Sequence, residues 1–264
     1  NFPVKEIEPE KIDIDIQTEF NFLCVAQWGP RKNIEKTAEW FVEEFHNDPS
    51  VGLVLKTQLA KNCLIDRRYC VERLRSLLSR YPERQCRIYL MHGSMTEGEM
   101  TSLYTHPKIK GIVSATHGEG FGLPLFEAAY NGMPVVAPNW SGQKDFLYAP
   151  QKDKKTKNTK QKPMFLKVDY TLENIDPSAV WETVLIADSQ WAIPKEHSFK
   201  TCLRNLYKDY GKHKTVANKL KKYLRKELSA ENQYNSFVAA LGANFKSLEV
   251  PPAIKVENIV EAYG

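Results

Sequence analysis

The residues with the clearest chemical potential lie between Thr116 and Ala137, in the run THGEGFGLPLFEAAYNGMPVVA. Two acids, Glu119 and Glu127, stand in it with seven residues between them. Glycine has no Cβ, so a glycine-rich loop can turn tightly and let a ligand approach its backbone. Where such a loop enters a helix, free N–H groups and the positive end of the helix dipole favour a phosphate. The segment therefore predicts a phosphate site framed by two carboxylates. Three glycines alternate through the loop: Gly118, Gly120 and Gly122.

The same run predicts its own local structure. Pro124 suits the first turn of a helix, where its missing N–H costs little. Asn131-Gly132 supplies a left-handed end to that helix. The residues from Pro134 to Ala137 are apolar and predict a buried strand. The expected unit is a loop, a helix and a strand.

This string, with its Gly-Met-Pro-Val-Val exit, resembles the E-x7-E signature of retaining glycosyltransferases of the family 4 type, which use nucleotide sugars. The resemblance spans roughly residues 20–241 and is strongest over residues 20–147. Enzymes of that family have two Rossmann-like lobes, the GT-B fold, and the signature belongs to the C-terminal, donor-binding lobe. The resemblance implies transfer of a sugar from a nucleoside diphosphate to a saccharide, lipid or protein hydroxyl, with the anomeric configuration kept.

The resemblance also implies roles for residues of the signature. It places Glu119 against the donor sugar as a catalytic residue, and it places Glu127 on the nucleotide ribose. A carboxylate suits the ribose because it can accept from two adjacent hydroxyls. None of these contacts needs a metal, so we expect no metal and no cofactor. The donor-binding loop positions are Gly120, Phe121, Gly122 and Leu123.

In the resembled family, the loop after the first strand of this lobe carries an Arg and, five residues later, a Lys that reach the donor diphosphate. Lys32 matches the second position, where a cation would stabilise charge on the leaving phosphate. The alternative is a solvated loop lysine. Gln27 stands at the first position and carries no charge, and Arg31 is a candidate replacement. The departure leaves open a non-catalytic module that binds a nucleotide or a glycan.

Three further positions have two interpretations each. The nucleobase is expected near Met95, whose polarizable sulfur either packs on the base or covers the core as an ordinary loop methionine. His117 either touches the sugar or packs within its loop. The run Asp13-Ile14-Asp15 imitates the DxD motif of metal-dependent glycosyltransferases, but it precedes the first strand instead of following a buried one. We therefore assign it no metal.

The elements that must position these residues alternate between strand and helix, which predicts a parallel, doubly wound, Rossmann-like α/β sheet followed by C-terminal helices. Ligands of such sheets bind at the carboxyl ends of the strands. The predicted strands are 20–26, 51–56, 87–91, 111–115, 135–137 and 164–170. The predicted helices are one capped by Asn33, one over 66–81, one opened by a Thr96–Glu99 capping box, one containing Pro124, one capped by Asp176 with Pro177 first, and a helical pattern over 198–241 that breaks near Gly211 and Ser229. The loops expected to converge are 27–32, 92–96, 116–122 and 138–143.

The expected organisation is a lead-in over residues 1–19, a nucleotide-sugar-binding lobe over 20–192, and a helical segment with a tail over 193–264. A basic, low-complexity insertion at 151–162 is expected to be a mobile loop inside the lobe. The chain holds one signature, so we expect half of an enzyme. The opposite lobe would come from a missing N-terminal segment or from a second chain.

The net charge and the apolar content limit the classes of partner that this chain can have. The net charge is +5, divided as −2 over residues 1–150 and +7 over the remainder. The basic half predicts solvated loops and helix faces, an anionic membrane surface, or nucleic acid. Nucleic acid is the least favoured, because the lysines of 151–162 have no aromatic residues between them. With no apolar run of membrane-spanning length and five scattered cysteines, we expect a cytoplasmic protein with reduced, buried thiols, either free or peripheral to a membrane.

Overall fold

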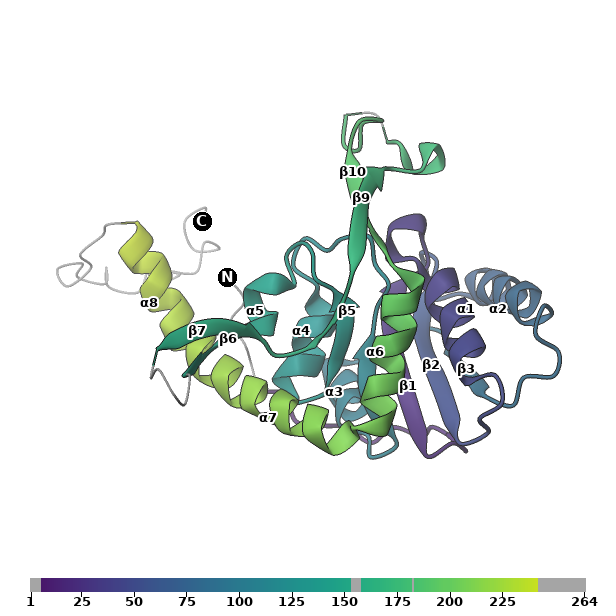
Figure 1. Ribbon diagram of the computed structural model, residues 1–264, viewed down its shortest axis with the longest axis horizontal. Helices are drawn as coiled ribbons and strands as arrows, with labels where there is room; N and C mark the ends of the chain where they lie inside the picture. The colour runs from purple at the N-terminus through teal and green to yellow at the C-terminus, as the bar shows by residue number, and fades with distance from the viewer. Residues whose placement is uncertain (1–5, 153–157, 182, 242–264) are drawn as a thin grey trace, which may run out of the picture. The chain divides into compact units, whose positions relative to one another are not determined.

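Figure 1 shows a computed structural model of the chain, in which residues 6–152, 158–181 and 183–241 are described. The described residues belong to two units. The larger runs from residue 6 to 226, and the smaller contains residues 227–241. Helix α8 (Ala230–Ala240) belongs to the smaller unit, and the Ser229 side chain caps it by accepting from the Asn232 N–H. No helix among the described residues combines the length and the apolar content needed to cross a bilayer.

A six-stranded, all-parallel sheet forms the centre of the larger unit, with the strand order β3-β2-β1-β4-β5-β8. The order reverses between β1 and β4, so the topological switch point lies there. This arrangement confirms the predicted doubly wound, Rossmann-like α/β fold. The strands are β1 (Phe20–Gln27), β2 (Val51–Gln58), β3 (Arg87–Met91), β4 (Ile109–Val113), β5 (Val135–Pro138) and β8 (Leu166–Val168).

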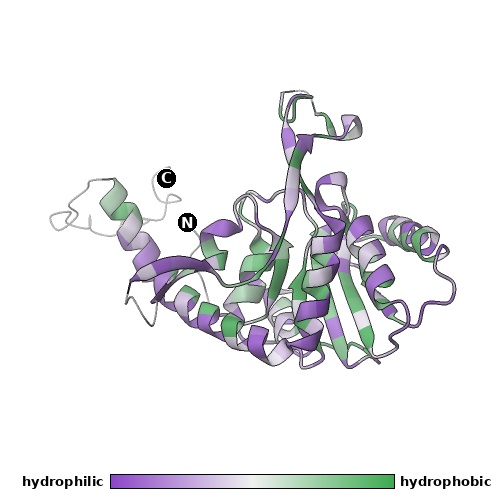
Figure 2. Ribbon diagram, viewed as in Figure 1, coloured by the Kyte–Doolittle hydropathy of each residue, from purple (hydrophilic) through white to green (hydrophobic). Residues whose placement is uncertain are grey.

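Helices cover both faces of this sheet (Figure 1). On one face α1 contacts both α2 and α6, and on the other face α4 contacts both α3 and α5. The core between α1 and the sheet is aromatic, with Phe22, Phe41 and Phe45 fully buried. Figure 2 shows the apolar strands at the centre and polar residues on the outer faces of the helices. The helices of the larger unit are α1 (Ile34–Phe45), α2 (Leu64–Leu78), α3 (Glu97–Thr105), α4 (Leu123–Tyr130), α5 (Lys144–Leu147), α6 (Glu196–Lys208) and α7 (Tyr210–Glu227).

The local signals read from the sequence explain where several helices begin and end. Thr96 and Glu99 form the predicted capping box at the start of α3. Pro124 lies in the first turn of α4, and Gly132 follows that helix with a φ of +77°. The predicted breaks separate α6, α7 and α8.

Residues 6–19 of the predicted lead-in are irregular, as predicted, and they are tied to the larger unit, whereas residues 1–5 lie outside the described part of the chain. The Glu10 backbone N–H donates to the carbonyl of Gly98 at 3.1 Å, and the Thr96 hydroxyl donates to the Glu10 carboxylate at 2.7 Å. Asp13 and Asp15 of the DxD-like run are both exposed. Hydrogen bonds therefore anchor this segment on α3.

The basic insertion differs from its prediction. Where a loop was predicted, residues 151–152 and 159–162 lie in an antiparallel ribbon of β6 (Tyr148–Lys152) and β7 (Thr159–Pro163). Residues 153–157 lie outside the described part of the chain. The ribbon's lysines are exposed, so no alternation of apolar and polar residues marked these strands in the sequence.

A second ribbon, β9 (Tyr170–Asn174) with β10 (Gln190–Pro194), rises beyond the carboxyl ends of the sheet strands (Figure 1). The predicted strand 164–170 is therefore shorter as β8 and gives way to β9. The predicted helix at Asp176-Pro177 is a single 3-10 turn, η2 (Pro177–Ala179). A short helix depends on packing for its stability. The large apolar residues that follow this turn are exposed and give it no core: Val180, Trp181, Val184 and Ile186.

Candidate functional site

The loop after β1 begins the site. It contains the 3-10 turn η1 (Pro30–Lys32) and then Asn33, whose φ of 53° is left-handed. Asn33 holds the N-cap position of α1, as predicted, but its side chain makes no capping bond. Its amide instead donates to the carbonyl of Ala115, just after β4, at 3.1 Å. Asn33 therefore links the loops on the two sides of the switch point.

The loop after β4 is held against the first loop by backbone contacts. The His117 N–H donates to the Arg31 carbonyl at 2.9 Å. The hydroxyl of Thr116, a fully buried residue, lies 3.2 Å from the same carbonyl and 3.1 Å from that of Gly118. These contacts fix the path of the chain up to Glu119.

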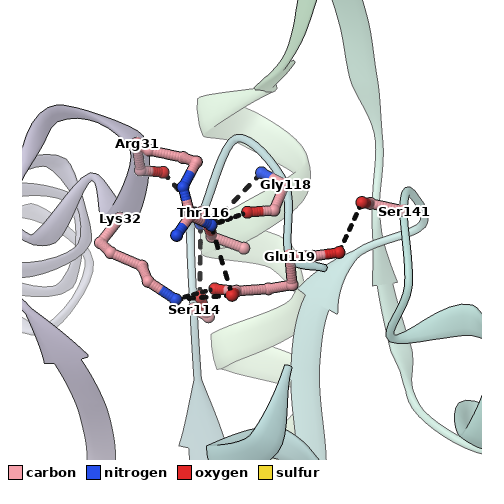
Figure 3. Close-up of polar contacts among 7 residues, drawn as sticks. All are labelled: Arg31, Lys32, Ser114, Thr116, Gly118, Glu119 and Ser141. Carbon is pink, nitrogen blue, oxygen red and sulfur yellow. Dashed lines mark hydrogen bonds and ion pairs between the residues drawn. The ribbon is translucent and has the colours of Figure 1, made fainter. Parts of the chain in front are cut away.

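The side chains of the two loops meet in an ion pair across the switch point (Figure 3). The Lys32 ammonium donates to both carboxylate oxygens of Glu119, at 2.7 and 2.5 Å. The Arg31 guanidinium lies 3.4 Å from the same carboxylate and also donates to the Gly118 carbonyl. The side chains of Lys32 and Glu119 are 19% and 10% exposed, so the pair is sheltered without being sealed. The predicted catalytic residues are therefore in direct contact.

A third loop, after β5, supports Glu119 from the other side. The Ser141 hydroxyl and the Gly142 N–H both donate to the Glu119 carbonyl, at 2.7 and 3.0 Å. A Cβ at Gly142 would lie 2.0 Å from the carbonyl oxygen of Gly120, so the close approach of the two loops requires a glycine there. Three of the four loops expected to converge thus meet at Glu119.

The start of α4 lies directly after these contacts. Gly122 has a φ of +89°, and no side chain caps the helix. A Cβ at Gly120 would meet nothing within 4 Å, so the space beside it is open. The Phe121 ring packs on Phe126 and Phe146 in the core, while the Leu123 side chain is exposed. The Phe121 ring of the predicted donor-binding loop therefore packs on buried aromatic residues, and the loop backbone is open at Gly120.

Glu127, the second acid of the signature, lies apart from these cations. The Tyr104 hydroxyl on α3 donates to its Oε2 at 2.8 Å. Burial raises the pKa of Glu127, and nearby Glu97 adds to that effect, while the bond from Tyr104 opposes it. The two acids of the signature therefore have different surroundings.

Gln27, at the position where the resembled family has an arginine, bonds elsewhere. Its amide donates to the Leu59 carbonyl, in the loop after β2, at 2.6 Å. It does not join the cluster of Arg31, Lys32 and Glu119. The cations that lie at this cluster are Lys32 and Arg31.

Met95 lines a cavity of about 630 Å³ at the carboxyl ends of β2 and β3. None of Lys32, Glu119 and Glu127 lines that cavity. The cavity beside the fourth loop is therefore lined without the Lys32–Glu119 pair, and the contact between Met95 and a base stays a prediction. The charged and polar residues that share the lining with Met95 are Lys11, Asp13, Lys56, Asn62, Arg67, His92, Ser94 and Glu99.

His117 packs against a strand outside its own loop, and a contact between its ring and a sugar stays a prediction. Its ring stacks on Trp191 of β10, with centroids 5.3 Å apart and planes 10° apart. Its Nδ1 lies 2.9 Å from the Ala192 carbonyl. Burial lowers the pKa of His117, so the ring is neutral near pH 7. The histidine therefore ties the β9–β10 ribbon to the loop that carries Glu119.

One trio of possible metal ligands, Asp66, Cys70 and His92, is grouped among the described residues, with ligand atoms within 4.8 Å of one another. The Asp66 carboxylate accepts from the N–H groups of residues 59–61, at 2.6 to 2.8 Å, and His92 Nε2 lies 2.8 Å from it. Burial opposes its charge, but these donors outweigh burial and hold the pKa of Asp66 well below its usual range. With its oxygens occupied, Asp66 fixes the loop after β2.

All five cysteines are free thiols. Four are buried, as predicted, but Cys63, just before α2, is exposed, contrary to that prediction. The exposed Cys63 lines the same cavity as Met95.

Sequence reasoning missed several residues that build the site. Thr116 and Asn33 hold the first two loops together, and Tyr104 holds Glu127. Only Asn33 had a signal, as a helix cap, and that signal indicated the wrong partner. The other contacts join segments that are far apart in the chain, and periodicity does not record such pairings.

No protein-family model matches this chain, and no curated protein sequence matches it. Solved structures do. The chain aligns with the C-terminal domain of a group 1 glycosyl transferase, LpcC of Francisella tularensis, at 14% identity and a TM-score of 0.54, covering 81% of this chain and 88% of that domain. It aligns with HepE (Alr3699) of Anabaena, solved with UDP and glucose, at 14% identity and 0.56. It aligns with sucrose-phosphate synthase (tll1590) of Thermosynechococcus elongatus at 16% and 0.56.

The chain has the fold of the C-terminal domain of GT-B glycosyltransferases. Identities this low show the fold alone. For both HepE and the sucrose-phosphate synthase, 85% of this chain is aligned, but it spans only 49% and 46% of their lengths. The GT-B C-terminal fold thus places the Lys32–Glu119 pair at its switch point, at the carboxyl ends of the strands.

Proposed function

We propose that this chain is the donor-binding half of a retaining glycosyltransferase, which transfers a sugar from a nucleoside diphosphate to a hydroxyl acceptor. The observation that carries the proposal is the Lys32–Glu119 pair at the switch point, beside the uncapped start of α4. Rossmann-type sheets bind nucleotides at this point. HepE, with the same fold, was crystallised with UDP and glucose, and TarM with UDP and a GlcNAc-glycerol, which supports a nucleotide sugar as the donor class.

In this proposal the diphosphate lies between Lys32 and the first turn of α4. The Lys32 ammonium exchanges a hydrogen bond to Glu119 for one to a phosphate oxygen, and the helix dipole favours the same charge. Arg31 holds Glu119 and its loop while Lys32 is engaged. These groups supply the positive charge that a leaving phosphate needs, so the mechanism requires no metal.

The sugar would lie over Gly120, where the space beside the backbone is open. Glu119, fixed by its cations and by Ser141, would accept from a sugar hydroxyl, and Glu127 would accept from the ribose. The acceptor hydroxyl attacks the anomeric carbon on the face that the diphosphate leaves, and the departing phosphate oxygen takes the acceptor proton. The bond to the diphosphate breaks as the new glycosidic bond forms, with configuration kept.

Transfer also needs an oriented acceptor. Proximity and orientation are worth about 7–11 kcal/mol of barrier. In GT-B enzymes a second lobe supplies them, so we propose an acceptor-binding lobe or a second chain as the partner of this half. A saccharide, a lipid or a protein hydroxyl remains the proposed acceptor class. The exposed lysines of the β6–β7 ribbon are available to an anionic membrane that carries a lipid acceptor.

One observation favours a second candidate, a binding module without transfer activity. The resembled family has a phosphate-binding arginine where this chain has Gln27. The Gln27 amide donates to the Leu59 carbonyl, so this position contributes to the fold and supplies no cation. In this candidate the chain still binds a nucleotide at Lys32 but does not transfer its sugar.

The test is a calorimetric screen of UDP, GDP and ADP, and of their common sugars, in EDTA and again in magnesium. We expect one of the diphosphates to bind equally well in both buffers, and we expect its binding to weaken in Lys32→Ala. Binding that needs magnesium would contradict the metal-free site. Adding the acceptor-binding half then separates the two candidates, since only the enzyme shows turnover above the Lys32→Ala background.

A further inference from the structure

Tyr104 and Glu127 join two helices on the α3 and α4 face of the sheet. Tyr104 lies in the last turn of α3 and is 3% exposed, and Glu127 lies near the middle of α4. The tyrosine hydroxyl donates to Oε2 of Glu127 at 2.8 Å. A buried tyrosine hydroxyl requires a partner, and here the partner is a carboxylate.

The surroundings of Glu127 contain little positive charge. Among the described residues no Lys, Arg or His forms an ion pair with it, and the groups of α3 that face it are Tyr104 and the acidic Glu97. Elements that also pack on α4 are α5, β5 and α7, and the cation that α7 brings there, Arg225, lies over the Tyr130 ring. The α5 side chains Lys144 and Asp145 are exposed and form no ion pair with Glu127. A neutral hydroxyl therefore orients this carboxylate.

This arrangement has a consequence for a ligand. Tyr104 occupies one acceptor site on Oε2 and restrains the carboxyl group about its terminal torsion, which is otherwise broad. A lysine in its place would neutralise the carboxylate. A hydroxyl leaves the negative charge in place, and Oε1 stays able to accept from a neighbouring diol.

We propose that Tyr104 is a positioning residue that holds Glu127 so that the site prefers nucleotides with a free 2′,3′-diol over deoxyribonucleotides. This inference rests on the proposed function, because it requires a nucleotide at the site. It goes beyond that function by naming Tyr104 as the residue that orients the ribose acceptor.

The test compares UDP with 2′,3′-dideoxy-UDP by calorimetry in wild type, Tyr104→Phe and Glu127→Gln. Wild type should prefer UDP by about tenfold or more, as expected for a hydrogen bond to a carboxylate. Tyr104→Phe should reduce that preference to about threefold or less and leave the binding of the dideoxy nucleotide unchanged. Tyr130→Phe is the matched control, since Tyr130 is also nearly buried on α4 but packs under the Arg225 guanidinium, and it should keep the full preference.

The outcomes separate this inference from the function it rests on. If Glu127→Gln removes the preference and Tyr104→Phe keeps it, the role of Tyr104 is wrong and the ribose assignment stands. If wild type binds UDP and dideoxy-UDP equally, the ribose assignment is wrong and this inference is wrong with it. If no diphosphate binds, the proposed function and the inference are both wrong.

A second measurement guards against a general loss of packing. Carboxyl NMR of Glu127 should show a higher pKa in Tyr104→Phe than in wild type, because the donor that opposes the effect of burial is gone. Tyr130→Phe should leave that pKa unchanged. A pKa that does not move in Tyr104→Phe would overturn the positioning role.

Discussion

Glu119 and Glu127 are the same residue type in one signature, and the fold treats them in opposite ways. Glu119 lies in a loop between two cations, with both oxygens engaged by Lys32. Glu127 lies on a helix, faces a neutral tyrosine, and has its pKa raised by burial. The spacing of the two acids in the sequence identifies them as a pair. The residues that contact each acid in the folded chain determine its chemistry. Glu119 holds a cation at the switch point, and Glu127 is a hydrogen-bond acceptor.

The largest effect should follow from removing the cation of the first acid. Lys32→Ala deletes a charge-assisted bond of about 1.5–3 kcal/mol, so affinity for a nucleoside diphosphate should fall by roughly 10- to 100-fold. Lys36→Ala is the control, because Lys36 is an exposed lysine of α1 that pairs with Glu39. Equal losses in the two variants, measured by calorimetry, would mean that Lys32 acts only through overall charge.

A somewhat smaller loss should follow from removing the second acid. Glu127→Ala leaves the diphosphate contacts intact and removes the acceptor for the ribose, so affinity should fall about tenfold. Affinity for inorganic pyrophosphate should stay at the wild-type value. A parallel loss for pyrophosphate would place Glu127 among the phosphate contacts and erase the distinction between the two acids.

The pH dependence of stability should also distinguish the second acid. The pKa of Glu127 is raised in the folded state, so its protonated form is favoured there, and that contribution to stability is complete below its unfolded value near 4.5. The contribution is lost as the pH rises through the folded value. Urea unfolding at several pH values should therefore show Glu127→Gln gaining stability relative to wild type above pH 4.5. A difference that does not vary with pH would contradict the effect of burial.

The smallest effect concerns the missing cation. Gln27 is exposed, so an arginine there would act through a wet, screened site. Gln27→Arg should tighten diphosphate binding by a few-fold at most, with the gain shrinking as salt is added. Unchanged or weaker binding would show that the bond from Gln27 to the Leu59 carbonyl matters to the loop.

The fold was predictable because its signals are local. The apolar positions of α1, the capping box of α3 and the glycine after α4 each mark one element, and parallel order follows from their alternation. The contact between Lys32 and Glu119 was expected only as convergence of loops, since the switch point brings their strands together.

The parts that could not be predicted depend on contacts without a sequence period. The lysine-rich ribbon β6–β7 has no apolar face, so its strands resembled a loop. Pro177 marked a helix start, but no core follows to extend one turn into a helix. Tyr104 meets Glu127 across two helices, a pairing that depends on how α3 packs on α4.

The decisive experiment on the role of the Lys32–Glu119 pair is a crystal structure of the chain soaked, in EDTA, with the nucleoside diphosphate that it binds. We expect a phosphate oxygen within hydrogen-bond distance of Lys32 Nζ and of the first-turn N–H groups of α4. We also expect the ribose hydroxyls on Glu127, with the Tyr104 bond to that carboxylate kept. A nucleotide bound in the cavity lined by Met95, with its phosphates away from Lys32 and its ribose away from Glu127, would show that the nucleotide site is not at the switch point.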